Sequence, residues 1–182
     1  MYLDRFHIPL ILILNSGGPV ELTDILQETE NIRAVLNISQ PGQEGGHAVA
    51  DILFGRAVPE GKLTATWAQQ YEDYPFSDTY SYLNGDLEKE EYREGIYVGY
   101  RYFDSFGVKP LFSFGYGLSY TSFGLAFRVL QTEKSSVQAR VAVTNTGQSY
   151  AGREVVQVYV SFPQAELKKR AEDLRDLQRQ TV

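Results

Sequence analysis

The chain has 182 residues, of which 43% are apolar and 22% charged, a composition typical of a globular protein with room for one or two small domains. Its formal net charge of −6 is spread without a basic stripe, which excludes the electrostatic footprint of a nucleic-acid-binding protein. The absence of cysteine excludes disulfides, thiolate metal sites and a cysteine nucleophile.

The longest apolar run covers residues 8–14 and is interrupted by Pro9. It is far shorter than the ~20 residues that cross a bilayer, and it lacks the basic flank and cleavage site of a signal peptide. We therefore interpret the run as a buried strand and expect no membrane partner. Together with the lack of cysteine, this favours a cytoplasmic location.

The first part of the chain predicts a strand–helix–strand unit. Continuous apolar runs at residues 8–14 and 32–38 predict strands that are buried on both faces. A helical pattern at residues 19–28 separates them, with Pro19 at the first helical position, where its missing N–H has no cost. Such a unit predicts adjacent parallel strands joined by a right-handed crossover, in a sheet covered by helices on both sides.

A second helix is predicted over residues 45–54, because apolar residues recur there at helical spacing and Gly55 can end it. Gly45 and Gly46 would let the start of this helix lie close against another backbone. Residues 63–67 then predict a short strand that ends the α/β part.

The rest of the chain changes character twice. Residues 71–110 mix aromatic and acidic residues, glycine and proline without a sustained period, which predicts an ordered connection packed along its neighbours. Valines alternate in residues 137–144 and 153–161, which predicts an antiparallel pair around the connection at 145–152. We expect Val141 and Val158 to point inward.

Four sequence blocks, in this order, resemble the C-terminal α/β sandwich domain of glycoside hydrolase family 3: NSGGPVE (15–21), PGQEGG (41–46), DILFG (51–55) and PEGKL (59–63). Two further blocks are similar to the family's connection into its fibronectin type III-like domain: EGIYVGYRYFD (94–104) and FGYGLSYTSF (114–123). Residues 141–160 resemble the first strands of that domain. The resemblance covers roughly residues 8–177.

The resemblance implies three parts. Residues 1–70 would be the C-terminal part of the α/β sandwich domain, residues 71–112 the aromatic-rich connection, and residues 113–182 a truncated fibronectin type III-like domain. The fold class is therefore α/β with a partial parallel sheet, followed by an all-β, immunoglobulin-like partial sandwich. Near the end, Ala171 stands where the family usually has proline, which lets Leu167, Ala171 and Leu174 line up as a helix.

The resemblance also implies which catalytic groups are missing. Enzymes of this family pair an aspartate nucleophile on a TIM-like barrel with an acid/base glutamate, and they retain anomeric configuration. The two carboxyl groups of a retaining glycosidase lie ~5–5.5 Å apart. The barrel has no counterpart here, and the acid/base glutamate precedes the strand that matches residues 8–14. No catalytic residue, metal or cofactor is therefore assigned to this chain.

Three residues are candidates for substrate binding. Glu44 lies between a predicted strand end and a helix start, where α/β proteins usually bind ligands, although the helix dipole also favours a glutamate there. Glu94 and Arg101 flank a predicted aromatic strand and could pair with each other or with an interdomain surface. The structural interpretation is favoured for all three.

Other side chains have a plain interpretation beside a functional one. Tyrosine and phenylalanine rings could stack on sugars or pack between domains, and packing is favoured; they are Tyr71, Tyr74, Phe76, Tyr80, Tyr82, Tyr92, Tyr97, Tyr100, Tyr102 and Phe103. His7 and His47 share no metal-binding motif. Asn37 begins a glycosylation pattern at the end of a predicted buried strand, which we interpret as an accidental match.

Two classes of function stay open from the sequence. The chain could be part of a β-glucosidase-like enzyme whose carbohydrate substrate is held by a barrel outside this chain. It could instead be a non-catalytic scaffold or a carbohydrate-contacting module. In either case we expect the chain alone to be inactive, and unpaired sheet edges to favour self-association.

Overall fold

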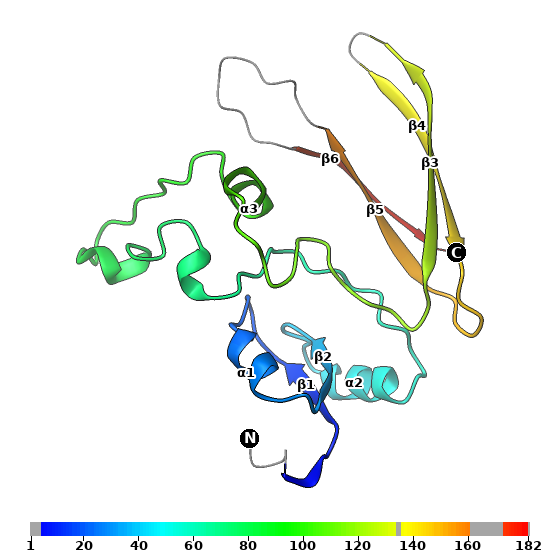
Figure 1. Ribbon diagram of the computed structural model, residues 1–182, viewed down its shortest axis with the longest axis horizontal. Helices are drawn as coiled ribbons and strands as arrows, with labels where there is room; N and C mark the ends of the chain where they lie inside the picture. Colours follow the sequence, from blue (N-terminus) through cyan, green and yellow to red (C-terminus); the bar gives the residue numbers. More distant parts are fainter. Residues whose placement is uncertain (1–4, 134–135, 161–172, 182) are drawn as a thin grey trace.

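The structure is a computed structural model that describes residues 5–133, 136–160 and 173–181 (Figure 1). A strand–helix–strand–helix segment comes first, a long segment with short helices follows, and longer strands come last. The predicted order of an α/β part followed by a β part is therefore confirmed. None of the helices in the described ranges is long and apolar enough to span a bilayer.

The N-terminal sheet consists of two parallel strands, β1 (Leu10–Leu14) and β2 (Ile32–Asn37), as predicted. The continuous apolar runs form these strands, and Leu12 lies opposite Val35. Beyond the end of β2, the sheet contact continues, because the Ile38 N–H donates to the carbonyl oxygen of Leu14 over 2.9 Å. The right-handed sense of the crossover stays a prediction.

The helix between these strands begins later than predicted. α1 spans Thr23–Glu28, so Pro19 is not its first residue and residues 19–22 are not helical. The Glu21 carboxylate accepts a hydrogen bond from the backbone N–H of Tyr71 over 2.8 Å and so ties this segment to a distant part of the chain. A tertiary contact here overrides the local helix signal of Pro19.

One face of the sheet is open, whereas the apolar runs predicted burial on both faces. Leu10, Leu12 and Leu14 are half-buried, but Ile11 and Ile13, which point to the other face, are 52% and 40% exposed. The prediction of helices on both sides of the sheet is therefore wrong for the described residues. An apolar run predicts a strand, but it does not show whether another element packs against each of its faces.

The second helix agrees with its prediction. α2 spans Gly45–Leu53, and Gly55 follows with a φ of +68°, a left-handed conformation that favours glycine. Gly45 is buried, and a Cβ atom there would lie 2.5 Å from Cγ of Pro41. The close neighbour at Gly45 is thus a proline ring and not the backbone that we predicted.

The strand predicted at residues 63–67 does not form. This segment runs antiparallel to a later one, with hydrogen bonds only at intervals: the Leu63 N–H donates to the Tyr116 carbonyl oxygen, and the Trp67 N–H to that of Phe112, both over 2.8 Å. A single isolated bridge joins Trp67 to Phe112. The intervals leave too few consecutive pairs for a strand, yet they connect the α/β part to the β part.

The aromatic connection contains short helices. Two 3₁₀ turns lie at Tyr71–Asp73 and Ser81–Asn84, and α3 spans Tyr100–Phe106. We predicted an aromatic strand next to Arg101, and this prediction is wrong. Glycines with positive φ stand at both ends of α3, and the one at position 107 ends the helix in the left-handed conformation.

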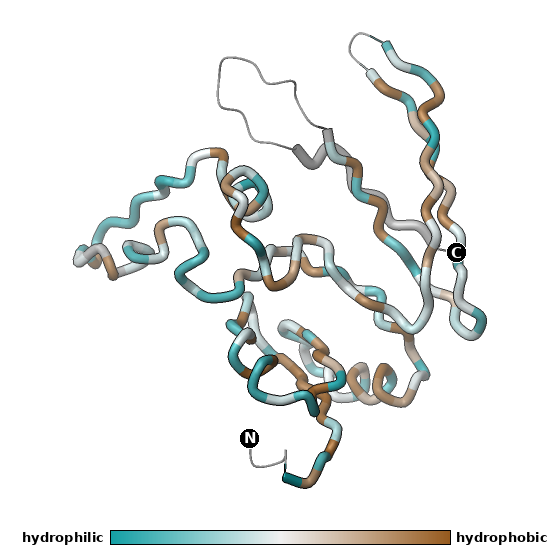
Figure 2. Tube along the Cα trace, viewed as in Figure 1, coloured by the Kyte–Doolittle hydropathy of each residue, from teal (hydrophilic) through white to brown (hydrophobic). Residues whose placement is uncertain are grey.

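The most deeply buried side chains gather where this connection meets the α/β part. Phe103 of α3 is 2% exposed, Trp67 is 4% exposed and Leu22 is 3% exposed. The Tyr74 ring meets Phe103 edge-on, with 5.9 Å between ring centroids. The aromatic residues at this junction therefore pack between parts of the chain, which is the interpretation that we favoured. Hydrophilic residues dominate the arm at residues 71–92, which extends beyond the junction (Figure 2).

Two antiparallel pairs of strands form the β part: β3 (Phe123–Thr132) with β4 (Val137–Asn145), and β5 (Arg153–Val160) with β6 (Asp173–Thr181). Figure 1 shows both pairs on the same side of the molecule, away from the N-terminal sheet.

The pairing that we predicted between residues 137–144 and 153–161 is wrong, because β4 and β5 belong to different sheets. Position 161 itself lies outside the described residues. The connection after β4 is fixed by the Asn145 side chain, whose amide donates to the carbonyl oxygen of Tyr150 over 2.8 Å and accepts from the Thr121 hydroxyl over 2.6 Å. These bonds hold the connection against the segment that precedes β3, and β5 begins a separate sheet.

The apolar side chains of the β part are only partly covered. Val141 and Val158, which we expected to point inward, are both half-buried, on different sheets. Phe127 lies directly opposite Val141 but is 63% exposed, and Leu125 and Val129 on the same strand are 56% and 48% exposed. The β3–β4 sheet therefore presents an apolar face that no described residue covers.

The helix predicted from Leu167, Ala171 and Leu174 is wrong at its last position. Leu174 belongs to β6 and lies opposite Tyr159 of β5. Leu167 and Ala171 lie outside the described residues. Pairing with β5 decides the conformation at Leu174, and local spacing could not reveal this partner.

Candidate functional site

Glu44 lies at the edge of the N-terminal sheet where the parallel strands end. The loops that follow β1 and β2 meet there, since a Cβ atom on Gly17 would lie 3.2 Å from Nε2 of Gln40. Glu44 is the N-cap residue of α2, but its side chain makes no capping hydrogen bond. Its carboxylate instead lies 2.6 Å from Nδ1 of His47, and both side chains are strongly exposed.

Glu94 and Arg101 are not brought together. Glu94 is half-buried and starts a turn in which its carbonyl oxygen accepts from the Tyr97 N–H over 3.0 Å. Arg101 lies on α3, and its guanidinium carbon is 5.5 Å from the centroid of the Tyr100 ring. No ion pair joins Glu94 to Arg101 in the part of the chain that the structure describes. The three candidates therefore do not form one site.

The aromatic residues divide into a packed group and an exposed group. Tyr97 and Tyr102 are half-buried and pack against Phe106 of α3, with ring centroids 5.1 and 5.0 Å from the Phe106 ring, which itself stays 59% exposed. The exposed group lies in the arm at residues 71–92 and has exposed fractions of 42%, 40%, 61% and 86% for Tyr71, Phe76, Tyr80 and Tyr92. The exposed rings are the ones that remain available for contact with a ligand or another surface.

The histidines stand apart. Across residues 5–133, 136–160 and 173–181, no group of three or more histidine and acidic side chains is arranged to hold a metal ion. His7 is exposed, and His47 contacts Glu44. Asn37 is the last residue of β2 and uses its side-chain oxygen to accept from the Ser39 N–H over 3.3 Å.

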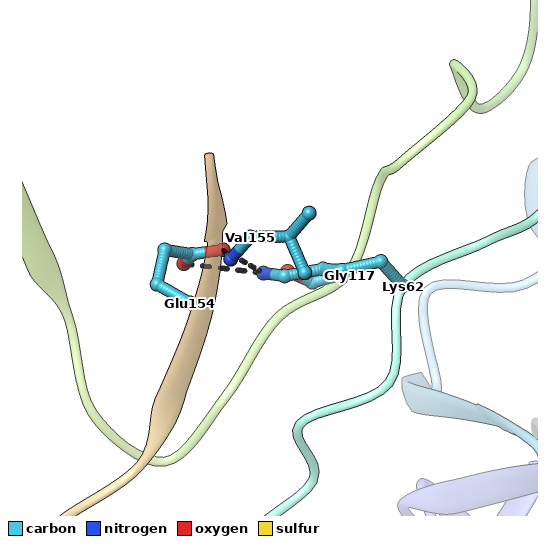
Figure 3. A network of polar contacts seen from close by, with 4 residues as sticks. All are labelled: Lys62, Gly117, Glu154 and Val155. Atoms are coloured by element: carbon cyan, nitrogen blue, oxygen red, sulfur yellow. Dashed lines mark hydrogen bonds and ion pairs between the residues drawn. The ribbon is translucent and has the colours of Figure 1, made fainter. Parts of the chain in front are cut away.

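One shielded polar network was missed by sequence reasoning (Figure 3). The Lys62 ammonium lies 3.0 and 3.2 Å from the two carboxylate oxygens of Glu154 on β5, and it donates to the carbonyl oxygen of Gly117 over 2.7 Å. The Glu154 carboxylate also accepts from the Val155 N–H over 2.8 Å. We call these residues the Lys62–Glu154 clamp.

The clamp is shielded from solvent and joins distant parts of the chain. The side chains of Lys62 and Glu154 are only 13% and 18% exposed, so their attraction is screened less than that of a surface pair. Lys62 lies near the end of the α/β part, after α2, whereas Glu154 lies on β5 in the β part. Because each charge has several polar partners, the clamp fits a structural role and leaves no spare group for acid/base chemistry.

A polar cavity of about 410 Å³ lies beside α1, lined by Glu21, Thr23, Asp24, Gln69, Gln70, Glu72, Asp73, Val108 and Lys109. Several of these groups already hold the backbone in place. Glu21 accepts from the Tyr71 N–H, Thr23 donates to the Gln69 carbonyl oxygen over 2.5 Å, and Asp73 accepts from the Gln70 N–H over 3.3 Å. The hydrogen bonds of these lining residues thus connect the start of α1 to the start of the aromatic connection.

Known proteins are similar in sequence to most of this chain. The model of the glycosyl hydrolase family 3 C-terminal domain matches residues 5–100. A probable β-glucosidase L of Emericella nidulans is 38% identical over 87% of this chain and 23% of its own length. The thermostable β-glucosidase B of Acetivibrio thermocellus is 36% identical over 93% of this chain and 22% of its own length.

The fold is also shared with solved structures. β-Glucosidase 3B of Thermotoga neapolitana in complex with glucose is 36% identical and has a TM-score of 0.86, with 97% of this chain and 24% of that chain covered. The β-glucosidase of Kluyveromyces marxianus in complex with glucose is 34% identical with a TM-score of 0.80, over 94% and 20% of the two chains. The chain thus spans less than a quarter of the length of these relatives.

Proposed function

Since this chain belongs to glycosyl hydrolase family 3, we propose that it forms the C-terminal part of a β-glucosidase-like enzyme that hydrolyses O-glycosyl bonds with retention of configuration. The similarity to named β-glucosidases across nearly the whole chain carries this proposal. The carbohydrate substrate would bind through a barrel domain that is not part of this chain. The clamp would keep the two parts of this chain in a fixed relation beside that barrel.

We propose further that the chain has no hydrolytic activity alone. A retaining glycosidase needs two carboxyl groups ~5–5.5 Å apart across the scissile bond. Glu44 is engaged with His47 at the start of α2, and Glu94 lies in a separate turn of the aromatic connection. Neither has the arrangement of a nucleophile opposite an acid/base group.

The purified 182-residue chain is therefore expected to release no aryl alcohol from aryl β-glucoside or aryl β-xyloside above the uncatalysed rate. Removing one member of a catalytic set costs several orders of magnitude in rate, because the members act together. Losing the barrel removes the positioning of the sugar as well. Release of the chromophore is followed over hours at high protein concentration.

Glu44→Gln and Glu94→Gln variants serve as controls for this assay. Turnover by the unchanged chain that disappears in either variant would contradict the proposal and identify a catalytic carboxylate. Turnover that persists in both variants points to a contaminating enzyme.

For the domain arrangement, we propose the division into residues 1–70, 71–112 and 113–182, the last being a partial fibronectin type III-like domain. Two antiparallel strand pairs in separate sheets support this, since such sandwiches are built from antiparallel strands in two layers. The clamp joins the first of these parts to the last.

A second candidate function is contact with carbohydrate by the exposed rings of the arm. Tyr80 and Tyr92, at 61% and 86% exposed, offer flat apolar faces of the kind that stack on sugar rings. This function needs no catalytic group, so it fits a non-catalytic module. Retention of the chain on an immobilised β-glucan column, lost in a Tyr80→Ala/Tyr92→Ala variant, distinguishes it from the enzyme proposal.

We also expect the chain to self-associate through the open face of the β3–β4 sheet. Leu125, Phe127 and Val129 expose 48–63% of their surface side by side, and such patches favour association. Light scattering is expected to show a mass that rises with concentration and falls in a Phe127→Lys variant. A Tyr92→Lys variant, which changes an exposed ring elsewhere, should behave as the unchanged chain. A constant monomer mass at all concentrations would contradict this expectation.

A further inference from the structure

Two arginines face each other across the β3–β4 sheet. Arg128 of β3 lies directly opposite Arg140 of β4 in the antiparallel register. Every other residue of these two strands is uncharged, so the charge of the sheet comes from these two side chains alone. We call them the arginine pair. Like charges directly opposite each other destabilise a sheet, so this arrangement works against the stability of the fold.

The arginine pair lies on the face of the sheet opposite to the apolar one. Because side chains alternate along a strand, Arg128 points away from the face that carries Phe127 and Val129. Both arginines are exposed. Their neighbours on this face, Ala126 and Ala142, lie opposite each other and are exposed as well. Small side chains therefore flank the pair and leave both guanidinium groups accessible.

The arginine pair is not neutralised by any of the residues that the structure describes, since neither guanidinium group forms an ion pair or a hydrogen bond with them. The nearest acidic residue along the chain is Glu133, in the connection between β3 and β4. Its carboxylate accepts from the Gln131 amide over 2.7 Å and from the Ser136 hydroxyl over 3.3 Å. Each arginine thus keeps its N–H donors for an external acceptor.

A carboxylate matches each guanidinium group in shape and charge. The guanidinium group is planar and always charged, and its N–H donors form a fork that binds both oxygens of one carboxylate. The Cβ atoms of directly opposite residues lie ~4.5–5.5 Å apart, so the two forks can bind carboxylates of the same ligand strand. The arginine pair stands on an open face and not in a cavity, which suits an extended polymer better than a small molecule.

The negative charge of the chain lies elsewhere. The arm at residues 71–92 contains seven acidic residues and one lysine, which equals the whole formal net charge of −6. Figure 1 shows this arm on the opposite side of the molecule from the β3–β4 sheet. Repulsion between exposed charges is largely screened beyond ~8 Å at physiological salt, so the arm does not keep an anionic ligand away from the arginine pair.

We propose that the arginine pair binds a strand of an acidic polysaccharide, whose uronic acid units carry carboxylates along the polymer. A polysaccharide is favoured over an acidic protein because this chain belongs to a glycosyl hydrolase family. Such binding tethers the chain to the polymer. It requires neither hydrolysis nor the exposed rings of the arm, so its test is independent of the tests of the functions proposed above.

Titration of the full chain with polygalacturonate at low ionic strength, followed by calorimetry, tests the proposal. We expect a Kd on the order of 0.1 mM per site, and weaker binding as salt is added, because exposed ion pairs are screened. Arg128→Gln and Arg140→Gln are each expected to weaken binding by about 5-fold, since each removes one charge-assisted contact. Replacing both arginines with lysine keeps the charge but removes the forks, so its affinity should lie between those of the unchanged chain and the double glutamine variant.

Arg33→Gln is the matched control, because Arg33 is an exposed residue of β2 without an arginine opposite it on β1. It should leave the Kd unchanged. The Arg128→Gln and Arg140→Gln variants should unfold at a temperature no lower than that of the unchanged chain, since they relieve a repulsion. A lower unfolding temperature would assign the pair a structural role and overturn the proposal.

Neutral dextran and polyglutamate are titrated in parallel, and both are expected to bind more weakly than polygalacturonate. Dextran binding of equal strength would show that carboxylates are not recognised. Polyglutamate binding of equal strength would show that the pair recognises acidic polymers in general, including protein surfaces. Either result would overturn the proposal, as would an absence of polygalacturonate binding or an equal loss of affinity in Arg33→Gln.

Discussion

Replacing Lys62 with methionine is expected to lower the free energy of unfolding of this chain by about 2–3 kcal/mol. The substitution leaves the Glu154 carboxylate shielded from water without its cation, and breaking a fully buried pair in this way costs ~3–5 kcal/mol. The Lys62 and Glu154 side chains are still 13% and 18% exposed, so we expect a loss of stability somewhat below that range. Urea denaturation followed by circular dichroism measures the change.

A surface pair provides the matched control. Lys89 donates to Glu91, and its ammonium holds the pKa of the Glu91 carboxyl below the usual 4.5, but both side chains are well exposed. Lys89→Met should therefore leave the stability nearly unchanged, since exposed pairs contribute little. Equal effects of Lys62→Met and Lys89→Met would show that the clamp is no stronger than an ordinary surface pair.

A double variant separates the pair from its individual charges. Lys62→Met combined with Glu154→Leu removes both charges, so neither is left buried without a partner. We expect its loss of stability to be clearly smaller than the sum of the two single losses. Additive losses would contradict a direct interaction between these side chains.

Gly117→Ala is expected to destabilise the chain by about 2–3 kcal/mol, near the upper end of the usual cost of overpacking. A Cβ atom at this position would lie 2.5 Å from the backbone carbonyl oxygen of Gly61 and 3.0 Å from Cδ of Lys62. Backbone cannot move aside as a flexible side chain can, so the segment that carries Lys62 must shift. Thermal and urea unfolding both report the loss.

The same substitution at Gly46 is the control for Gly117→Ala. Gly46 lies inside α2, and a Cβ atom there would meet no atom within 4 Å. Gly46→Ala should therefore stabilise the chain by ~0.5–1 kcal/mol, because alanine favours helix and loses less entropy on folding. A stabilising effect of Gly117→Ala would contradict the close approach of Gly117 to the Gly61 carbonyl oxygen.

The sequence was most informative where the local pattern and the tertiary structure agree. Continuous apolar runs bounded by glycine and proline correctly predicted β1, β2 and their parallel pairing. Gly55 correctly marked the end of α2. The start of α1 was wrong because the decisive contact, from Glu21 to Tyr71, comes from a part of the chain that no local window contains.

The sequence also contains signals for α3 and β3, two elements that our predictions omit. Glycines at positions 99 and 107 flank α3, and such punctuation marks the ends of a short helix even in an aromatic stretch. Leu125, Phe127 and Val129 alternate along β3, and this alternation would have supplied β4 with its true partner. Without β3, the next alternating segment was the only available partner for β4.

The candidate site was harder to predict than the fold. Lys62 and Glu154 have no periodic or motif-based relation to each other, and only the folded chain brings them together. Conversely, sequence neighbours alone indicate the three candidates for substrate binding, Glu44, Glu94 and Arg101. The structure leaves these residues in separate places. Long-range polar pairs of this kind become visible only with the tertiary structure.

The clamp also affects the order of events during biosynthesis. Its two charged residues are 92 positions apart, so Lys62 leaves the ribosome well before Glu154 does. At ~5–20 residues per second, the delay is about 5–20 s, which is long compared with the folding of a small helix and sheet. The α/β part must therefore persist for that time without the stabilisation that the clamp supplies, and the two parts of the nascent chain lock together only after β5 has been made.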